Sequence, residues 1–248
     1  MVKMKPAKTP YSLTAPQRWD EMPWGEYFNQ SLNQHLQPYL SKLYGSHLLK
    51  MGQLSAAVET DSCPISHQFT LQPGQAGGEV AGEATRLPFL SKSIDACLLV
   101  HALAWEQDPH QVLREADRVL IDDGWMILTG FNPYSLLGTG KLLPGVRRRS
   151  PWNSKMFSQG RLLDWLSVLN YEIICRKGCQ VVPWRKQGGQ FLSAHLPALG
   201  CINILVARKR TYPLTLNKNS LPAGRARIRT AVNVSRQCSE AKPQDPEG

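Results

Sequence analysis

The strongest constraint on the fold is one nearly uninterrupted apolar run in the middle of the chain. Residues 94–100 read Ile-Asp-Ala-Cys-Leu-Leu-Val, and Asp95 is the one polar residue among them. A strand that is buried on one face alternates apolar and polar residues, whereas a continuous apolar run is typical of a strand covered on both faces. The run therefore predicts the central strand of a sheet that lies between two other layers.

The segments after this run alternate between helical and strand patterns. Asp108-Pro109 indicates a helix start, with an acidic N-cap followed by proline, and Gly124 is expected to end that helix. A second helix is predicted over 158–169. Buried strands are predicted over 125–129, 171–176 and 201–207. The order strand, helix, strand, helix, strand, strand predicts an α/β fold with a mostly parallel sheet.

The N-terminal half is less regular. Residues 1–20 are polar and are expected to form an irregular arm, and a helix is predicted over 24–43, where Pro38 kinks or splits it. A short buried strand is predicted over 47–51. Segment 59–82 carries two prolines and four glycines, which disfavour a helix and leave room for strands near 65–71 and 78–84. We therefore expect an abbreviated half that consists of a short connection and a hairpin.

An ordered set of short motifs follows between residues 84 and 124. They are Ala84-Thr-Arg-Leu-Pro-Phe89, Ser93-Ile-Asp95, His101-Ala-Leu103, Asp108-Pro109, Leu113-Arg-Glu-Ala-Asp-Arg-Val-Leu120 and Gly124. In this order and spacing they resemble the class I S-adenosylmethionine-dependent methyltransferases, in particular those with a type-11 methyltransferase domain, many of which act on small molecules. The resemblance covers roughly 83–130 and implies a Rossmann-like fold with helices on both faces of the sheet. It makes 21–209 the methyltransferase-like domain.

The resemblance also implies S-adenosylmethionine as the cofactor. In an open parallel sheet a ligand binds outside the carboxyl ends of the strands, where the strand order reverses. By the resemblance, Glu83 lies near the adenine amine, Ala84 and Leu87 contact the adenine ring, and His101 lies below the methyl group. The predicted cofactor contacts are Gly52, Glu83, Ala84, Leu87, Val100 and His101. No catalytic residue and no metal ligand is assigned.

Some of these residues have a second interpretation. His101 could be a hydrogen-bonded wall residue rather than a proton acceptor, and Asp95 could be a charge at a strand entry. Arg114, Glu115 and Arg118 are expected to lie on a solvated helix face. The first loop has one glycine, Gly52, and the second strand ends in Gln72 where the family carries an acid. Two functions therefore remain open: a methyltransferase with a small-molecule acceptor, and a catalytically degenerate fold that binds RNA or protein.

The net charge of +10 is unevenly distributed. Residues 208–236 carry eight Lys or Arg and no Asp or Glu. We expect 210–248 to be a disordered basic tail, which either holds RNA through its phosphates or serves solubility. No stretch approaches the ~20 apolar residues of a membrane span, and the basic N-terminus lacks the apolar core of a secretory signal. We therefore expect a cytoplasmic, bacterial-type protein with no membrane partner, and the sequence leaves its oligomeric state open.

Overall fold

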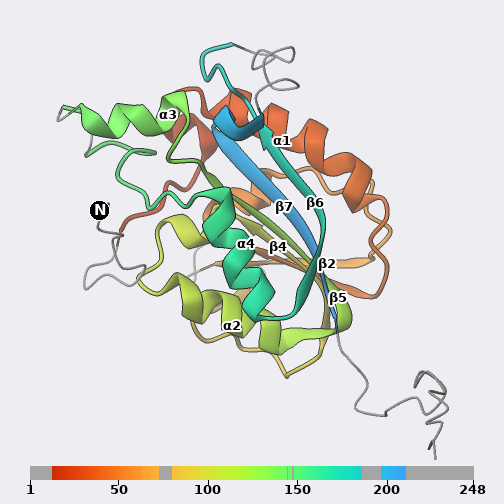
Figure 1. Ribbon diagram of the computed structural model, residues 1–248. Coiled ribbons are helices and arrows are strands. Elements are labelled where there is room, and N and C mark those ends of the chain that lie inside the picture. Colours follow the sequence, from red (N-terminus) through yellow and green to blue (C-terminus); the bar gives the residue numbers. More distant parts are fainter. Residues whose placement is uncertain (1–12, 73–79, 144, 147, 186–196, 211–248) are drawn as a thin grey trace, which may run out of the picture. The chain divides into compact units, whose positions relative to one another are not determined.

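The computed structural model describes residues 13–72, 80–143, 145–146, 148–185 and 197–210 (Figure 1). These residues belong to one compact unit of the chain. The predicted basic tail lies outside them except for Arg210, and so does most of the predicted N-terminal arm. The disorder expected of the tail therefore stays a prediction.

The described strands form one sheet in the order β3-β2-β1-β4-β5-β7-β6. Their bounds are β1 (His47–Met51), β2 (His67–Gln72), β3 (Val80–Ala81), β4 (Ile94–Val100), β5 (Leu120–Phe131), β6 (Tyr171–Cys179) and β7 (Ile202–Lys209). β7 is antiparallel to β5 and β6, whereas the pairs from β3 to β5 are all parallel. The prediction of a mostly parallel α/β sheet is confirmed.

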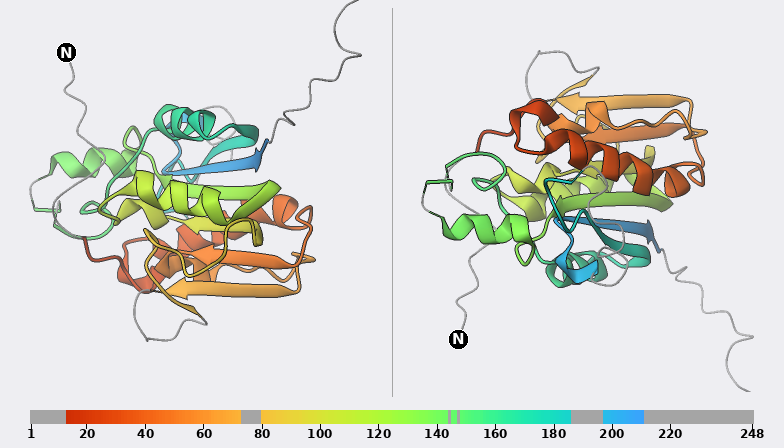
Figure 2. Two further views of the ribbon diagram at one scale, coloured as in Figure 1. Left: turned by 90° about the horizontal axis from the view of Figure 1, so that it is seen from below. Right: turned by 90° about the horizontal axis from the view of Figure 1, so that it is seen from above.

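β4 is covered on both faces, as its apolar run predicts. Ala96, Leu98 and Val100 belong to one buried cluster, and Cys97 and Leu99 belong to a second. The first cluster lies under α1 (Gly25–Leu40), and the second lies under α2 (Pro109–Val119) and α4 (Gln159–Val168). Figure 2 shows the resulting three layers, with α1 on one face of the sheet and α2 and α4 on the other. The predicted Rossmann-like arrangement is therefore confirmed.

Helix α2 starts as predicted but ends earlier. The Asp108 side chain accepts a hydrogen bond from the backbone N–H of Gln111 at 3.1 Å, which caps the helix. The helix ends at Val119, and Gly124 lies inside β5, where the pairing with β4 shifts register. The prediction that Gly124 ends the helix is therefore wrong. A glycine after a helical pattern also suits an irregular strand entry, and its position alone does not separate the two.

The N-terminal half is abbreviated, but its described strands form no hairpin. β1 pairs with β2 in parallel, from His47 opposite His67 to Met51 opposite Leu71, and β2 pairs with β3 in parallel. The chain returns from β1 to β2 through the 3-10 helix η2 (Gln53–Ala57) and a loop. Proline and glycine indicated correctly that the described residues of segment 59–82 form no α-helix. They mark turns and carry no information about the direction of the following strand, which is why the predicted hairpin was wrong.

The described end of the N-terminal arm contributes to the core. Trp19, in the 3-10 helix η1 (Trp19–Glu21), is 2% exposed, and its indole Nε1 donates a hydrogen bond to the carbonyl oxygen of Leu54 at 3.2 Å. This contact links the segment before α1 to η2. A polar composition with several prolines gives no hint of such a buried side chain.

Asp95, the polar residue of β4, binds the backbone at the start of β1. One carboxylate oxygen, Oδ2, accepts hydrogen bonds from the backbone N–H groups of Ser46 and His47, both at 2.9 Å. Gly45 precedes them with φ of 125°, and a Cβ there would lie 2.3 Å from the Asp95 carboxyl carbon. Asp95 is therefore a structural charge at a strand entry.

We predict that Asp95→Ala lowers the free energy of unfolding by about 1–3 kcal/mol, because two backbone donors lose their charged acceptor. Urea denaturation measures this loss. Asp122→Ala is the matched control, since its ion pair with Lys92 joins two largely exposed side chains and should contribute less than about 1 kcal/mol. Equal losses in the two variants would contradict the assigned role of Asp95.

Candidate functional site

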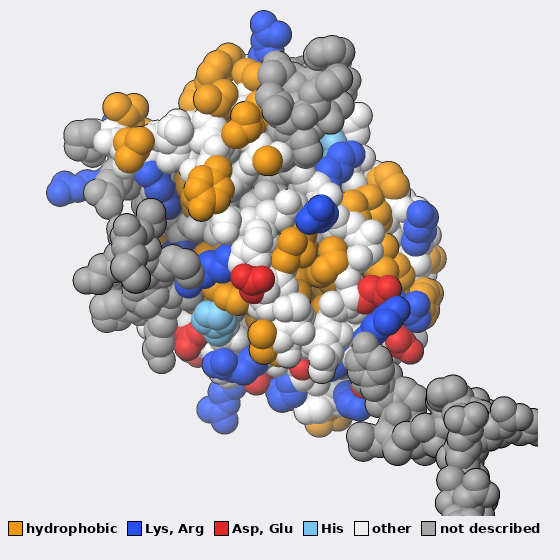
Figure 3. Space-filling view, viewed as in Figure 1, with side chains coloured by type: hydrophobic (Ala, Val, Ile, Leu, Met, Phe, Trp, Pro, Cys, Tyr) orange, Lys and Arg blue, Asp and Glu red, His pale blue; other side chains and the backbone are white. Residues whose placement is uncertain are grey.

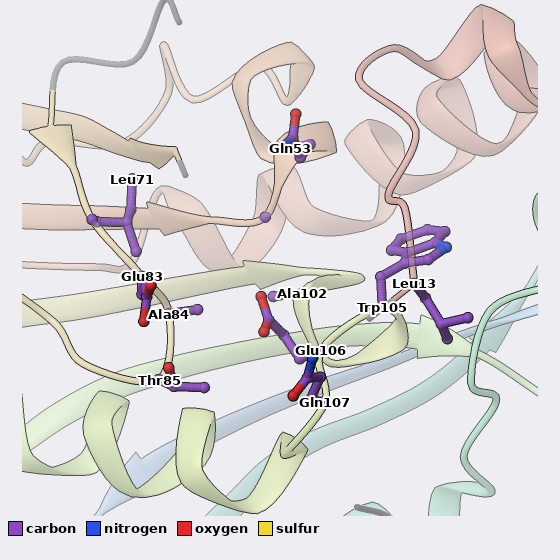
Figure 4. A pocket seen from close by; sticks show the side chains of 12 residues that line it. Leu13, Gln53, Leu71, Glu83, Ala84, Thr85, Ala102, Trp105, Glu106 and Gln107 are labelled. Carbon is purple, nitrogen blue, oxygen red and sulfur yellow. The ribbon is translucent and has the colours of Figure 1, made fainter. Parts of the chain in front are cut away.

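A cavity of about 400 Å³ opens at the carboxyl ends of the parallel strands (Figure 4). Its walls come from the turn after β1, the loop after β3 and the turn after β4, with one residue of β2 and one of the N-terminal segment. The lining residues are Leu13, Gly52, Gln53, Leu71, Gly82, Glu83, Ala84, Thr85, Ala102, Trp105, Glu106 and Gln107. This is the place where parallel sheets bind ligands.

The cavity brings together three of the six predicted cofactor contacts. Gly52, Glu83 and Ala84 line it, although they come from two loops far apart in the sequence. The structure places the other three side chains in the core: Leu87 is 4% exposed, Val100 1% and His101 0%. Their assignment as cofactor contacts stays a prediction, and their side chains are not part of the cavity wall.

Gly52 allows the turn after β1 to pass over the end of β4. Its φ is 98°, a conformation that side chains disfavour, and a Cβ would lie 2.5 Å from the carbonyl oxygen of Val100. The carbonyl of Gly52 accepts hydrogen bonds from Ser55, which start the following 3-10 helix. A single glycine therefore suffices to bring this turn against the end of β4.

The loop that carries Glu83 and Ala84 is fastened to α2. Glu115 accepts a hydrogen bond from the backbone N–H of Leu87 at 3.0 Å, and Arg118 donates to the carbonyl oxygens of Leu87 and Phe89 at 3.1 and 3.0 Å. Glu115 and Arg118 also pair with each other at 2.9 Å. The hydrogen bond from Arg118 holds the pKa of Glu115 below its usual value.

Arg114 is exposed, as the predicted solvated helix face requires, but the prediction is wrong for Glu115 and Arg118, which bind the loop. The Glu115 side chain is only 14% exposed, because it reaches the loop rather than water. A pair at positions i and i+3 of a helix looks the same in a sequence whether it faces solvent or a neighbouring loop. The two side chains position the cavity wall without lining it.

His101 occupies a closed aromatic environment. Its ring stacks on Phe131 with centroids 4.0 Å apart and meets the edge of Trp19 at 5.7 Å. Neither ring nitrogen has a hydrogen-bond partner among the described residues, and burial lowers the pKa of His101 to about 3. The backbone is left-handed, with φ of 51°. A neutral ring without access to the cavity does not accept a proton from a ligand there, so His101 packs in the core beside the cavity, and the hydrogen bonds expected of a wall residue are not formed by its ring among the described residues.

The turn after β4 places an acid in the cavity. Lys155 holds this turn through its ammonium group, which donates to the carbonyl oxygens of Glu106 and Gln107 at 2.7 and 3.0 Å. In Figure 4 the Glu106 carboxylate extends toward the side of the cavity where Glu83 lies. Burial and then the charge of Glu83 raise the pKa of Glu106, and the charge of Lys155 opposes this.

Several residues that line the cavity were not predicted from the sequence. Trp105, Glu106 and Gln107 follow the best predicted strand, so the rule that ligands bind beyond the carboxyl ends of strands could have indicated them. Leu71 also ends a predicted strand and could have been found in the same way. Leu13 could not, because nothing in the polar N-terminal segment indicates that it folds back over the sheet.

Two comparisons with known sequences place this chain in a family. Residues 44–128 match the family model described as a methyltransferase domain. The chain is 49% identical to the uncharacterized protein YafS of Escherichia coli strain K12 over 241 residues, which cover 97% of this chain and 100% of YafS. The chain belongs to the YafS family. It carries a methyltransferase domain, so the predicted resemblance is confirmed.

Solved structures share the fold at low sequence identity. An S-adenosylmethionine-dependent methyltransferase from Thermotoga maritima has a TM-score of 0.56 and 18% identity, with 75% of this chain and 93% of that one covered. Geranyl diphosphate C-methyltransferase from Streptomyces coelicolor, with S-adenosylhomocysteine bound, has a TM-score of 0.52 and 12% identity, with 73% of this chain and 77% of that one covered. The domain and these neighbours imply S-adenosylmethionine as the methyl donor, as the sequence predicted. The [4+2]-cyclase SpnF also matches, with a TM-score of 0.55, 18% identity and coverage of 77% and 84%, so the fold alone does not define the reaction.

We predict that Glu106→Gln stabilises the protein at neutral pH and not in acid. A raised pKa means that the folded state holds the Glu106 proton more tightly than the unfolded state. The stability from this proton is present below the ordinary value of 4.5 and is lost as the pH rises through the raised pKa. The melting temperature of the variant should therefore exceed that of the wild type increasingly from acid to neutral pH. The exposed Glu59→Gln is the control, and a Glu106→Gln advantage independent of pH would contradict the argument.

Proposed function

We propose that this protein is an S-adenosylmethionine-dependent methyltransferase that binds its cofactor in the cavity beyond β1, β3 and β4 and acts on a small-molecule acceptor. The observation that supports this proposal most is that one cavity at the carboxyl ends of the strands is lined by three of the cofactor contacts implied by the resemblance, Gly52, Glu83 and Ala84. The further proposal that the chain works in the cytoplasm fits the described residues, which contain no helix of the length and apolarity of a membrane span.

The lining residues fit the chemistry of this cofactor. An adenosine needs an acceptor for its exocyclic amine and an apolar contact for its ring, and Glu83 supplies the first while Leu71 and Ala84 supply the second. The sulfonium and ammonium groups are cationic, and the two carboxylates, Glu83 and Glu106, make the cavity favourable for positive charge. The amides of Gln53 and Gln107 add donors and acceptors.

The acceptor has its own side of the cavity in this proposal. Figure 4 shows Leu13 and Trp105 on the opposite side from Leu71 and Glu83. Their apolar surfaces suit the carbon skeleton of a small molecule better than the charged backbone of a nucleic acid. The bound cofactor supplies an electrophilic methyl group, and the protein holds the acceptor nucleophile in line with it.

Glu106 is the candidate proton acceptor. A base is needed only where the acceptor loses a proton as its new bond to the methyl carbon forms. The raised pKa of Glu106 makes its carboxylate a stronger base than an exposed glutamate, and the side chain lies in the cavity wall. His101, with its lowered pKa and closed environment, does not fill this role.

We predict that S-adenosylmethionine and S-adenosylhomocysteine both bind the full chain in isothermal titration calorimetry. Glu83→Ala should weaken binding by roughly tenfold or more, because a hydrogen bond to a charged acceptor contributes about 1.5–3 kcal/mol. Asp164→Ala, which removes an exposed acid of α4 away from the cavity, is the control and should bind as the wild type does. No heat from either ligand at millimolar concentration would contradict the proposal and favour the degenerate binding module.

The size class of the acceptor can be tested with methyl-labelled S-adenosylmethionine and a bacterial extract. The extract is separated into small-molecule, protein and RNA fractions before the reaction. Label transferred to the small-molecule fraction supports the proposed acceptor class. Label in protein or RNA alone would overturn that class while leaving the methyltransferase activity intact.

A further inference from the structure

The segment between β5 and α4 exposes a group of large apolar side chains. Tyr134 is 71% exposed, Leu136 48%, Leu142 84% and Leu143 58%. They lie within or beside α3 (Leu136–Thr139) and η4 (Gly140–Leu142). We call these four residues the apolar tip. Large apolar side chains that are exposed together on one short segment mark an interaction surface more often than scattered single residues do.

The apolar tip lies in a purely basic part of the sequence. Residues 124–163 contain six Lys or Arg and no Asp or Glu. Two of the basic residues, Arg148 and Arg149, are exposed, and no ion pair joins them to an acid within the described part of the chain. Figure 3 shows apolar side chains over α3 and basic side chains near them, beside that helix. The surface is therefore complementary to one that is both anionic and apolar.

Buried contacts hold the tip in this exposed position. Leu137, beside exposed Leu136, is 1% exposed, and its carbonyl oxygen accepts a hydrogen bond from the Trp152 indole at 2.8 Å. Ser135 caps α3 by accepting from the N–H of Gly138, and Lys141 donates to the carbonyl oxygen of Ser154 at 2.6 Å. One side of the segment is thus fixed to the core, so the outer leucines face away from it.

The tip projects from the same end of the molecule as the cavity. Both views in Figure 2 show α3 at the end toward which β2 points, which is the carboxyl end of the parallel strands. A convex projection with leucines, a tyrosine and nearby arginines has the composition of segments that lie in a membrane interface, where leucines enter the acyl boundary and basic groups contact anionic lipids.

We propose that the apolar tip, together with Arg148 and Arg149, docks this protein peripherally on anionic lipid bilayers. The proposal does not depend on the proposed catalytic function. It is also compatible with the lack of a spanning helix among the described residues, because peripheral docking needs no such helix. The lack of a spanning run, on which the expectation of no membrane partner was based, does not bear on contact of this kind.

Co-sedimentation of the full chain with vesicles tests the proposal. Vesicles of phosphatidylcholine alone are compared with vesicles that also contain phosphatidylglycerol, and we expect binding to the second. The double variant Leu142→Ser, Leu143→Ser should bind the anionic vesicles with an affinity at least roughly tenfold lower than that of the wild type, because two large apolar side chains that are buried in the bilayer are lost. The matched control is Leu90→Ser, Val168→Ser, since these side chains are 81% and 80% exposed elsewhere on the fold. It should bind as the wild type does.

A second pair of variants separates the tip from the basic tail. Arg148→Gln, Arg149→Gln should lower the salt dependence of binding, whereas Arg176→Gln, Lys177→Gln, on exposed positions of β6, should leave it unchanged. Circular dichroism confirms that each variant is folded. Failure of the wild type to bind anionic vesicles overturns the proposal. If salt abolishes binding equally in the wild type, in the leucine variant and in the Arg148→Gln, Arg149→Gln variant, the binding belongs to the basic tail. That result also overturns the proposal. Self-association that the leucine variant abolishes, without vesicle binding, would make the tip a protein interface instead.

Discussion

The burial of β4 on both faces is the constraint on which the rest of the fold depends. Its side chains alternate between two clusters, so one helical layer must lie on each side of the sheet. Its neighbours β1 and β5 run parallel to it, and β2 runs parallel to β1. The chain must therefore cross back over the sheet after β1 and after β4 to start the next parallel strand. The turns that leave the carboxyl ends of β1 and β4 consequently meet at one edge. The cavity forms there because the chain direction of three strands is the same.

The contacts around the cavity show how a short N-terminal half still builds a complete wall. Gly52 lets the turn after β1 approach the end of β4 closely, and Glu115 with Arg118 fastens the opposite loop to α2. Neither device requires a long crossover helix. β2 ends in Gln72, where the resemblance implies an acid, and Glu106 places a second carboxylate in the cavity from the turn after β4. This difference concerns the ligand chemistry rather than the fold.

The sequence predicted those elements that depend mainly on residues close together in the chain. The apolar run of β4 and the Asp108-Pro109 start of α2 could be predicted because they depend on neighbouring residues. The direction of β2 could not, since it depends on the long-range pairing of β2 with β1. His101 shows the same limit at the site. Its place after β4 suggested contact with a ligand, but the ring lies between Phe131 and Trp19, which come from distant segments. Long-range packing decides which residues of a strand end reach the cavity.

The central claim is that the cofactor lies in the cavity formed by the turns after β1, β3 and β4. Hydrogen–deuterium exchange of the full chain, with and without saturating S-adenosylhomocysteine, tests it most directly, because a bound ligand slows the opening of the backbone that it contacts. We expect protection of peptides that cover residues 52–57, 82–85 and 102–107. Unchanged exchange in all three, or protection confined to other parts of the chain, would contradict the central claim.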